Sequence, residues 1–264
     1  MNTLAPLTEQ LQLEIIDHTA LITINNPPAN TWTENNLRGL LDLLASLEKR
    51  QDIYALVITG AGDKFFSAGA DLNQFAHGDK QHAELVANEF SKAFEALADF
   101  KGVSIAAING YAMGGGLEVA LACDIRIAEA HAQLALPETK VGLLPCGGGT
   151  QRLSWLVGEG WAKRIILCGD RINADKAEQI GLVEEVVETG KALEAALVLA
   201  AKAAQQSPIA VNYSKLLIHC ARDQAIKSSL VRERQRFIDL FDTEDQVEGV
   251  KAFLEKRRAQ WKNQ

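Results

Sequence analysis

A glycine-dense stretch that ends in an acidic residue is the first place where this sequence could do chemistry. It reads Gly110-Tyr111-Ala112-Met113-Gly114-Gly115-Gly116-Leu117-Glu118 and follows an apolar run expected to be a strand. Adjacent glycines cost backbone entropy, so they indicate a junction where the backbone must approach something closely. A helix opened by them presents free N–H groups and a positive dipole end, which suit developing negative charge. The alternative is a helix entry that only close packing requires.

Two carboxylates stand out because of their neighbours. Glu118 lies among apolar residues, so we expect it to be buried, and a buried carboxylate needs a partner or a role. Glu138 follows Pro137 at the end of a short predicted strand, and open α/β sheets bind ligands near strand ends. The alternatives are a solvated helix residue at Glu118 and a surface turn acid at Glu138, since acids are usually exposed.

A third segment, Ser67-Ala68-Gly69-Ala70-Asp71, follows another predicted strand region and contains mostly small residues. Without bulky side chains, a backbone N–H there can approach a ligand closely. An ordinary tight loop would have the same composition, so the segment alone does not decide between the two interpretations.

Several classes of site are missing from the sequence. There is no Gly-x-x-x-x-Gly-Lys-Ser/Thr phosphate loop, no Gly-x-Gly-x-x-Gly after a strand and no Gly-x-Ser-x-Gly elbow. The 5 histidines show no ligand spacing, and no Cys-x-x-Cys occurs, so we expect no metal site and no cofactor.

Elements that would position these residues alternate between strand and helix. Strands are predicted at 11–16, 20–25, 54–59, 103–109, 124–128 and 133–136, and helices at 33–50, 82–100, 117–122 and 150–157. Residues 65–75 look irregular, and after Ser207-Pro208 only helices are expected, one of them capped by Thr243. The pattern predicts an α/β fold with largely parallel strands, in which residues 1–205 form the core and 206–264 an all-helical region.

Composition limits the partners. The net charge is −7, from 34 acidic and 27 basic residues, which disfavours nucleic-acid binding. We expect Cys123, Cys168 and Cys220 to be buried and Cys146 to lie near a turn. With no disulfide pattern, no signal-like start and no stretch of membrane-spanning length, the sequence predicts a cytoplasmic protein without membrane contact.

Taken together, these segments resemble the enoyl-CoA hydratase/isomerase (crotonase) family. The likeness rests on Ala107–Glu118, on Ser67–Leu72, and on Ala132–Glu138 with the Gly147-Gly148-Gly149-Thr150-Gln151-Arg152-Leu153 run. Matches at Gly169–Ile172 and Ala252–Arg257 extend it toward the C-terminus. The resemblance implies a crotonase-like spiral of ββα units with a C-terminal helical trimerisation region, and a homotrimer or a dimer of trimers.

Carried over residue by residue, the resemblance assigns the oxyanion hole to the backbone N–H groups of Ala70 and Gly115. It assigns acid/base roles to Glu118 and Glu138, and having both favours hydration over isomerisation. The coenzyme A part of an acyl-CoA substrate is expected to contact five further residues, the last two of them from a neighbouring subunit: Ala68, Asp71, Leu72, Phe253 and Lys256. Lys256 could equally be a solvated helix residue.

The resemblance therefore implies hydration of 2-enoyl-CoA to 3-hydroxyacyl-CoA, of the fatty acid β-oxidation type. Isomerisation, thioester hydrolysis and a non-enzymatic acyl-CoA binding protein are the alternatives. Two segments depart from the family pattern, Asn25–Trp32 and Pro145-Cys146-Gly147, and both are expected where the acyl chain or coenzyme A could pass. They leave the acyl chain length open.

Overall fold

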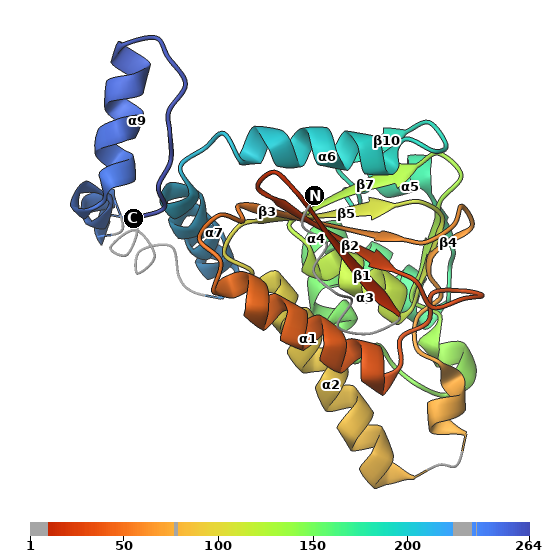
Figure 1. Ribbon diagram of the computed structural model, residues 1–264. Coiled ribbons are helices and arrows are strands. Elements are labelled where there is room, and N and C mark those ends of the chain that lie inside the picture. Colours follow the sequence, from red (N-terminus) through yellow and green to blue (C-terminus); the bar gives the residue numbers. More distant parts are fainter. Residues whose placement is uncertain (1–9, 77–78, 224–233, 236) are drawn as a thin grey trace.

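The computed structural model describes residues 10–76, 79–223, 234–235 and 237–264. Strands and helices alternate through its first part, as the sequence predicts (Figure 1). The strands are β1 Leu11–Ile16, β2 Thr19–Ile24, β3 Ala55–Gly60, β4 Phe65–Ser67, β5 Val103–Ile108, β6 Tyr111–Met113, β7 Ile125–Glu129, β8 Gln133–Ala135, β9 Ile172–Asn173 and β10 Glu185–Val187. The helices are α1 Glu34–Glu48, η1 Leu72–Phe75, α2 Lys80–Ala98, α3 Gly115–Ala122, η2 Glu138–Val141, α4 Gly149–Leu167, α5 Ala174–Gln179, α6 Ala192–Ala203, α7 Pro208–Asp223, η3 Leu240–Asp242 and α9 Glu244–Leu254.

The strands form two sheets. A 6-stranded sheet has the order β1-β2-β3-β5-β7-β10, and a 4-stranded sheet has the order β4-β6-β8-β9. Pairing is parallel except for the β1–β2 hairpin and the β8–β9 pair, which confirms the predicted α/β class with largely parallel strands. The carboxyl ends of β4 and β8 lead directly into the segments that carry Ala70 and Glu138.

Strand β3 shows how one sheet supports two cores. All its residues are buried, and successive side chains of a strand point to opposite faces. Leu56 and Ile58 belong to the large core that includes α1 and α2, whereas Ala55 and Val57 belong to the small core under α6. Figure 1 shows α6 crossing one side of the sheet, with α1 and α2 on the other. Burial on both faces explains why the strand reads as a continuous apolar run.

Helix α1 begins directly after Thr33, the residue at which the sequence predicts the start of a helix. The Thr33 hydroxyl accepts the backbone N–H of Asn36, and the Asn36 side chain accepts the N–H of Thr33 in return. The reciprocal bonds satisfy amides that the first helical turn leaves without partners. The cap places Trp32 next to Gly69 and Ala70 through a short parallel bridge.

The structure corrects several details of the prediction. The irregular stretch 65–75 contains β4 and η1, and the glycine-dense stretch contains the short strand β6. The predicted helix at 150–157 is only the first half of α4, which continues beyond a kink at Gly158 (φ 76°) to Leu167. Cys168, at the end of α4, is exposed rather than buried, and Cys220 is half-buried, whereas Cys123 is buried as predicted.

Beyond Ser207 the described residues contain helices and no strand, as expected. The Thr243 hydroxyl accepts the N–H of Gln246 at the start of α9, in agreement with the predicted cap. Helix α9 projects away from the sheets (Figure 1), and the boundary of a separate helical domain at residue 206 stays a prediction. In the part of the chain that the structure describes, no helix is both long and apolar enough to cross a membrane.

Asn109 ties the end of β5 to the end of β3. Its amide group donates to the carbonyl oxygens of Gly60 and Gly62, both at 2.8 Å, and accepts the N–H of Gly60 at 3.2 Å. Asn109 is only 8% exposed and Gly60 is buried, so the N–H and carbonyl groups of Gly60 have little access to water once the Asn109 side chain is removed.

We expect Asn109→Ala to lower the free energy of unfolding by on the order of 2–3 kcal/mol, because it leaves buried polar groups unpaired. Urea denaturation measures the loss. Asn73→Ala is the matched control, since Asn73 is exposed and its side chain donates its hydrogen bond to the carboxylate of Asp71 within the same turn. A loss of the same small size in both variants would contradict the assignment.

Candidate active site

One cavity of about 790 Å³ collects the residues that the sequence singles out for chemistry. Ala70, Gly115, Glu118 and Glu138 all line it, although they come from three different segments. Ala70 follows β4, Gly115 and Glu118 lie on α3, and Glu138 begins η2 after β8. The parallel order β4-β6-β8 places the ends of these strands side by side, which is why the segments meet.

Close backbone contact sets the distance between the Ser67–Ala70 segment and the start of α3. A Cβ placed on Gly116 would overlap the carbonyl oxygen of Ser67, so only glycine lets α3 lie this near to β4. A Cβ placed on Gly115 would lie 3.7 Å from the nitrogen of Ala70. The run of glycines is thus explained by packing against the Ser67–Ala70 segment, and the packing itself brings Gly115 and Ala70 together.

The backbone N–H groups of Ala70 and Gly115 are available to a ligand. The neighbouring amides of Asp71 and Gly114 bond to the carbonyl oxygens of Trp32 and Ala135. Among the hydrogen bonds of the described residues, none is donated by the amide of Ala70 or of Gly115. Gly115 is also the first residue of α3, where the helix leaves its N–H groups unsatisfied. Two free amides on one cavity wall can stabilise an oxygen that gains negative charge.

Glu118 is buried and firmly held. It is 2% exposed, and its Oε1 accepts the N–H groups of Gly147 and Gly149, both at 2.8 Å. Burial raises the pKa of Glu118, while the two amides and the charge of Arg152 oppose the rise. Because Gly149 is the first residue of α4, the carboxylate also sits at the positive end of that helix. The sequence predicted the burial but not these partners.

The Glu138 carboxylate, unlike that of Glu118, has no hydrogen-bond donor among the described residues. Both of its carboxylate oxygens are buried. Burial raises the pKa of Glu138 to about 7, its own backbone N–H opposes the rise, and the nearby charge of Glu118 adds to it. The two carboxyl groups therefore interact, one fixed by amides and one that holds its proton near neutral pH.

The rest of the cavity wall is mostly apolar. Helix α2 contributes Ala83, Ala87 and Phe90, and the segment after Glu138 contributes Val141, Leu143 and Leu144. Thr31 and Cys146, which belong to the two segments that depart from the family pattern, also line the cavity. Cys146 is an exposed residue overall, but burial of its thiol, together with the charges of Glu118 and Glu138, raises the pKa of that thiol to about 12. Both departures therefore contribute to the wall of the cavity that holds the two glutamates.

Of the residues expected to contact coenzyme A, some line the cavity and others do not. Ala68 and Leu72 line the cavity together with the site. Asp71 does not line it, because its carboxylate accepts the backbone N–H of Asn73 and caps η1. Lys256 lies beyond the end of α9, away from the cavity, and the side chain of Phe253 lies outside the described residues.

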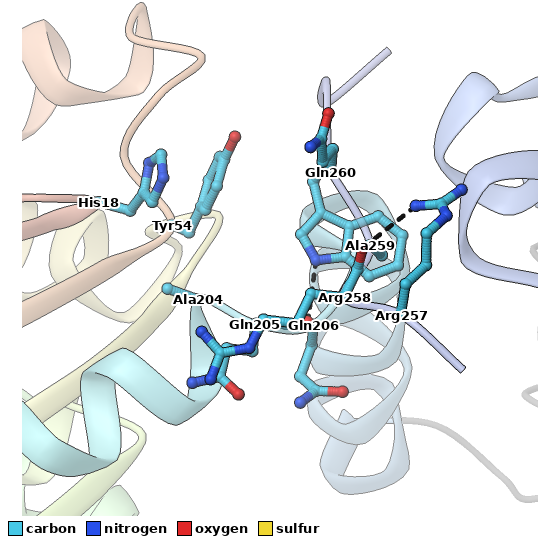
Figure 2. A pocket seen from close by; sticks show the side chains of 10 residues that line it. His18, Tyr54, Ala204, Gln205, Gln206, Arg257, Arg258, Ala259 and Gln260 are labelled. Carbon is cyan, nitrogen blue, oxygen red and sulfur yellow. Dashed lines mark hydrogen bonds between the residues drawn. The ribbon is translucent and has the colours of Figure 1, made fainter. Parts of the chain in front are cut away.

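A second hollow, of about 560 Å³, lies between the β1–β2 turn and the C-terminal segment (Figure 2). His18 stacks on Tyr54, with 4.5 Å between the ring centroids. Trp261, which also lines the hollow, donates to the carbonyl oxygen of Gln205. Arg257, at its edge, pairs with Glu248 and Glu255. No carboxylate lines this hollow, so it offers nothing comparable to the paired glutamates.

Sequence reasoning missed the groups that hold Glu118, because they lie far along the chain. In the sequence, the Gly147–Gly149 run contributes to the family resemblance and precedes the helix predicted at 150–157, but neither observation links it to Glu118. Its amides reach Glu118 across 29 and 31 positions. Adjacent glycines before a helix occur here as they do at Gly114–Gly116. They could therefore also have been interpreted as a helix start whose free N–H groups bind a negative charge.

Comparison with known proteins identifies related chains and a shared fold. Residues 14–264 match the family model described as enoyl-CoA hydratase/isomerase. A short-chain-enoyl-CoA hydratase of Clostridium acetobutylicum is 39% identical over 90% of this chain and 92% of its own length. The structure of Pseudomonas aeruginosa DspI is similar with a TM-score of 0.95 at 64% identity, covering 97% of both chains. An enoyl-CoA hydratase structure from Bacillus anthracis is similar with a TM-score of 0.93 at 36% identity, covering 97% of this chain and 100% of the other. These likenesses confirm the expected crotonase-like fold.

We expect the carboxyl group of Glu138 to titrate near pH 7 and to keep a raised pKa in Glu118→Gln, though a lower one than in the unchanged protein. Burial, the larger cause, remains in the variant, whereas the like charge at position 118 is gone. Carboxyl ¹³C NMR of glutamate-labelled protein measures both values. A Glu138 pKa near 4.5, the ordinary value, would contradict the described environment.

Proposed function

Because the chain belongs to the enoyl-CoA hydratase/isomerase family, we propose that it hydrates 2-enoyl-CoA thioesters to 3-hydroxyacyl-CoA. The observation that carries the proposal is the meeting of Glu118 and Glu138 on one cavity wall, beside the free amides of Ala70 and Gly115. Hydration needs a base for water, an acid for carbon and a site for negative charge on oxygen, and these four residues can supply all three.

In the proposed reaction, the amides of Ala70 and Gly115 hold the thioester oxygen. Attack of water on the β-carbon moves electron density through the α-carbon onto that oxygen, which becomes enolate-like. Each fixed N–H donor bonds more strongly to the charged oxygen than to the neutral carbonyl. Removing one such donor typically costs about 3–4 kcal/mol of barrier.

The two glutamates then divide the proton transfers. Glu118, ionised, takes a proton from the water as the oxygen bonds to the β-carbon. Glu138, protonated, gives its proton to the α-carbon, and the net change adds H and OH across the double bond. A pKa raised to about 7 keeps Glu138 partly protonated at neutral pH. The two amides on Glu118 favour its ionised form.

Several expectations from the sequence remain part of this proposal. The chain is proposed to act as a homotrimer or a dimer of trimers, in which Phe253 and Lys256 contact coenzyme A in a neighbouring subunit, while Asp71 contacts it within its own. The reaction as written needs no cofactor and no metal, and the cytoplasmic location stays a prediction. Ala68 and Leu72 support the coenzyme A assignment most directly, since they share the cavity with the glutamates.

We expect Glu118→Gln and Glu138→Gln each to lower kcat for crotonyl-CoA hydration by roughly 10²–10⁴-fold, because each removes one positioned acid/base group. Loss of absorbance of the conjugated thioester measures the rate. Glu159→Gln is the matched control, since Glu159 is an exposed residue paired with Lys163. Turnover at the control's level in either active-site variant would refute the proposed roles.

The alternative of isomerisation is tested by offering the unchanged protein both 2-enoyl-CoA and 3-enoyl-CoA. The hydratase proposal predicts that 2-enoyl-CoA is consumed with formation of 3-hydroxyacyl-CoA, and that 3-enoyl-CoA is a much poorer substrate. Chromatographic analysis of the products separates the reactions. Faster turnover of 3-enoyl-CoA would instead favour an isomerase, and tight binding without turnover of either substrate would favour a binding protein.

A further inference from the structure

Arg152 lies behind the loop that holds Glu118. It belongs to the first turn of α4, and its side chain folds back so that Nη1 donates to the carbonyl oxygen of Gly147 at 3.1 Å. Gly147 in turn gives its N–H to Glu118. One residue of the loop is therefore fixed from both sides, by the carboxylate through its N–H and by the guanidinium through its carbonyl.

The loop has a shape that accommodates this guanidinium. Gly148 has a φ of 98°, in the left-handed region that favours glycine. A Cβ placed on Gly148 would overlap Nη1 of Arg152. The backbone turn and the position of the guanidinium thus fit each other, and both keep the amides of Gly147 and Gly149 directed at Glu118.

We propose that Arg152 is a positioning residue for the hydration reaction, which fixes Gly147 and thereby holds the Glu118 carboxylate in its orientation. This inference rests on the proposed function. Arg152 does not line the active-site cavity, so it acts through Gly147 and through its charge, without touching the substrate.

Charge supports the same assignment. The positive charge of Arg152 lowers the pKa of Glu118, against the effect of burial. The other charged or titratable groups that face Glu118 are the carboxyl of Glu138 and the thiol of Cys146. Loss of the charge at position 152 therefore leaves Glu118 with two amides but without its cation, and its pKa rises.

Arg152 itself has other charged neighbours. Glu95 on α2 and Asp99 at its end favour its charged form, while Arg222 on α7 and burial disfavour it. The ion pairs of the described residues include none that ties Arg152 to an acidic side chain within 4.0 Å. Among the hydrogen bonds of the residues that the structure describes, the one donated by the Arg152 side chain goes to the Gly147 carbonyl oxygen.

The test compares Arg152→Met, Arg152→Lys and the control Arg164→Met. Arg164 lies on the same helix, is largely exposed and pairs with Asp170, away from the loop. In Arg152→Met we expect kcat for crotonyl-CoA to fall roughly ten-fold or more, because a charge-assisted hydrogen bond is lost. The acidic limb of the kcat/KM profile should move up by roughly 0.5–1 pH unit, since Glu118 must lose its proton at higher pH.

Arg152→Lys separates charge from hydrogen bonding. It keeps the cation, so we expect the acidic limb to stay near that of the unchanged enzyme while kcat falls. If the role of Arg152 were purely structural, its variants would have a lower melting temperature and less active enzyme, but the acidic limb of the kcat/KM profile would not move in any of them. This result would overturn the proposal. An Arg152→Lys variant with unchanged kcat and an unchanged limb would overturn the role of the hydrogen bond to Gly147.

A second readout does not depend on activity. Carboxyl ¹³C NMR should show a higher pKa for Glu118 in Arg152→Met than in the unchanged protein or in Arg164→Met. If the protein hydrates no enoyl thioester but this shift appears, the proposed function fails and the link between Arg152 and Glu118 stands. If hydration is normal and the pKa of Glu118 is the same in all variants, the inference fails and the function stands. Should Arg152→Met not fold, Arg152→Lys decides by its kcat.

Discussion

The arrangement of the site depends on one interaction, the capture of the buried Glu118 carboxylate by the amides of Gly147 and Gly149. A carboxylate that is 2% exposed cannot keep its charge without such donors. The same two bonds join α3 to the start of α4, and thereby fix the segment between Glu138 and Gly147 that forms one wall of the cavity. The same two hydrogen bonds thus stabilise the buried charge and hold the two helices together.

The contrast between the two glutamates follows from their local backbone. Glu118 lies on a helix that other glycines approach, so amides can reach it, whereas Glu138 follows a proline at a strand end and faces the cavity. One acid is therefore stabilised as a carboxylate and the other is left without a donor in the described structure. Burial raises the pKa of both side chains, but at Glu118 two amide donors oppose the rise, and this difference in surroundings suits separate acid and base roles.

Much of the site could be predicted because its signals are local. Adjacent glycines marked the Gly114–Gly116 junction, and apolar neighbours marked Glu118. The partners of Glu118 could not be predicted in this way, since they depend on contacts between residues far apart along the chain. Helix α4 was cut short in the prediction because Gly158 interrupts its regular backbone, and Cys168 was misplaced because an apolar neighbourhood in sequence does not reveal an exposed helix end.

The close contact of Gly116 with Ser67 has an evolutionary consequence. The distance between the two amides of the proposed oxyanion hole is set by main chain against main chain, so side-chain replacement elsewhere cannot readily alter it. The apolar wall, by contrast, is built from ordinary side chains such as Ala83, Ala87 and Leu144. Reaction chemistry and substrate preference are consequently encoded in separate parts of the molecule, and selection can diversify the second while the first stays constant.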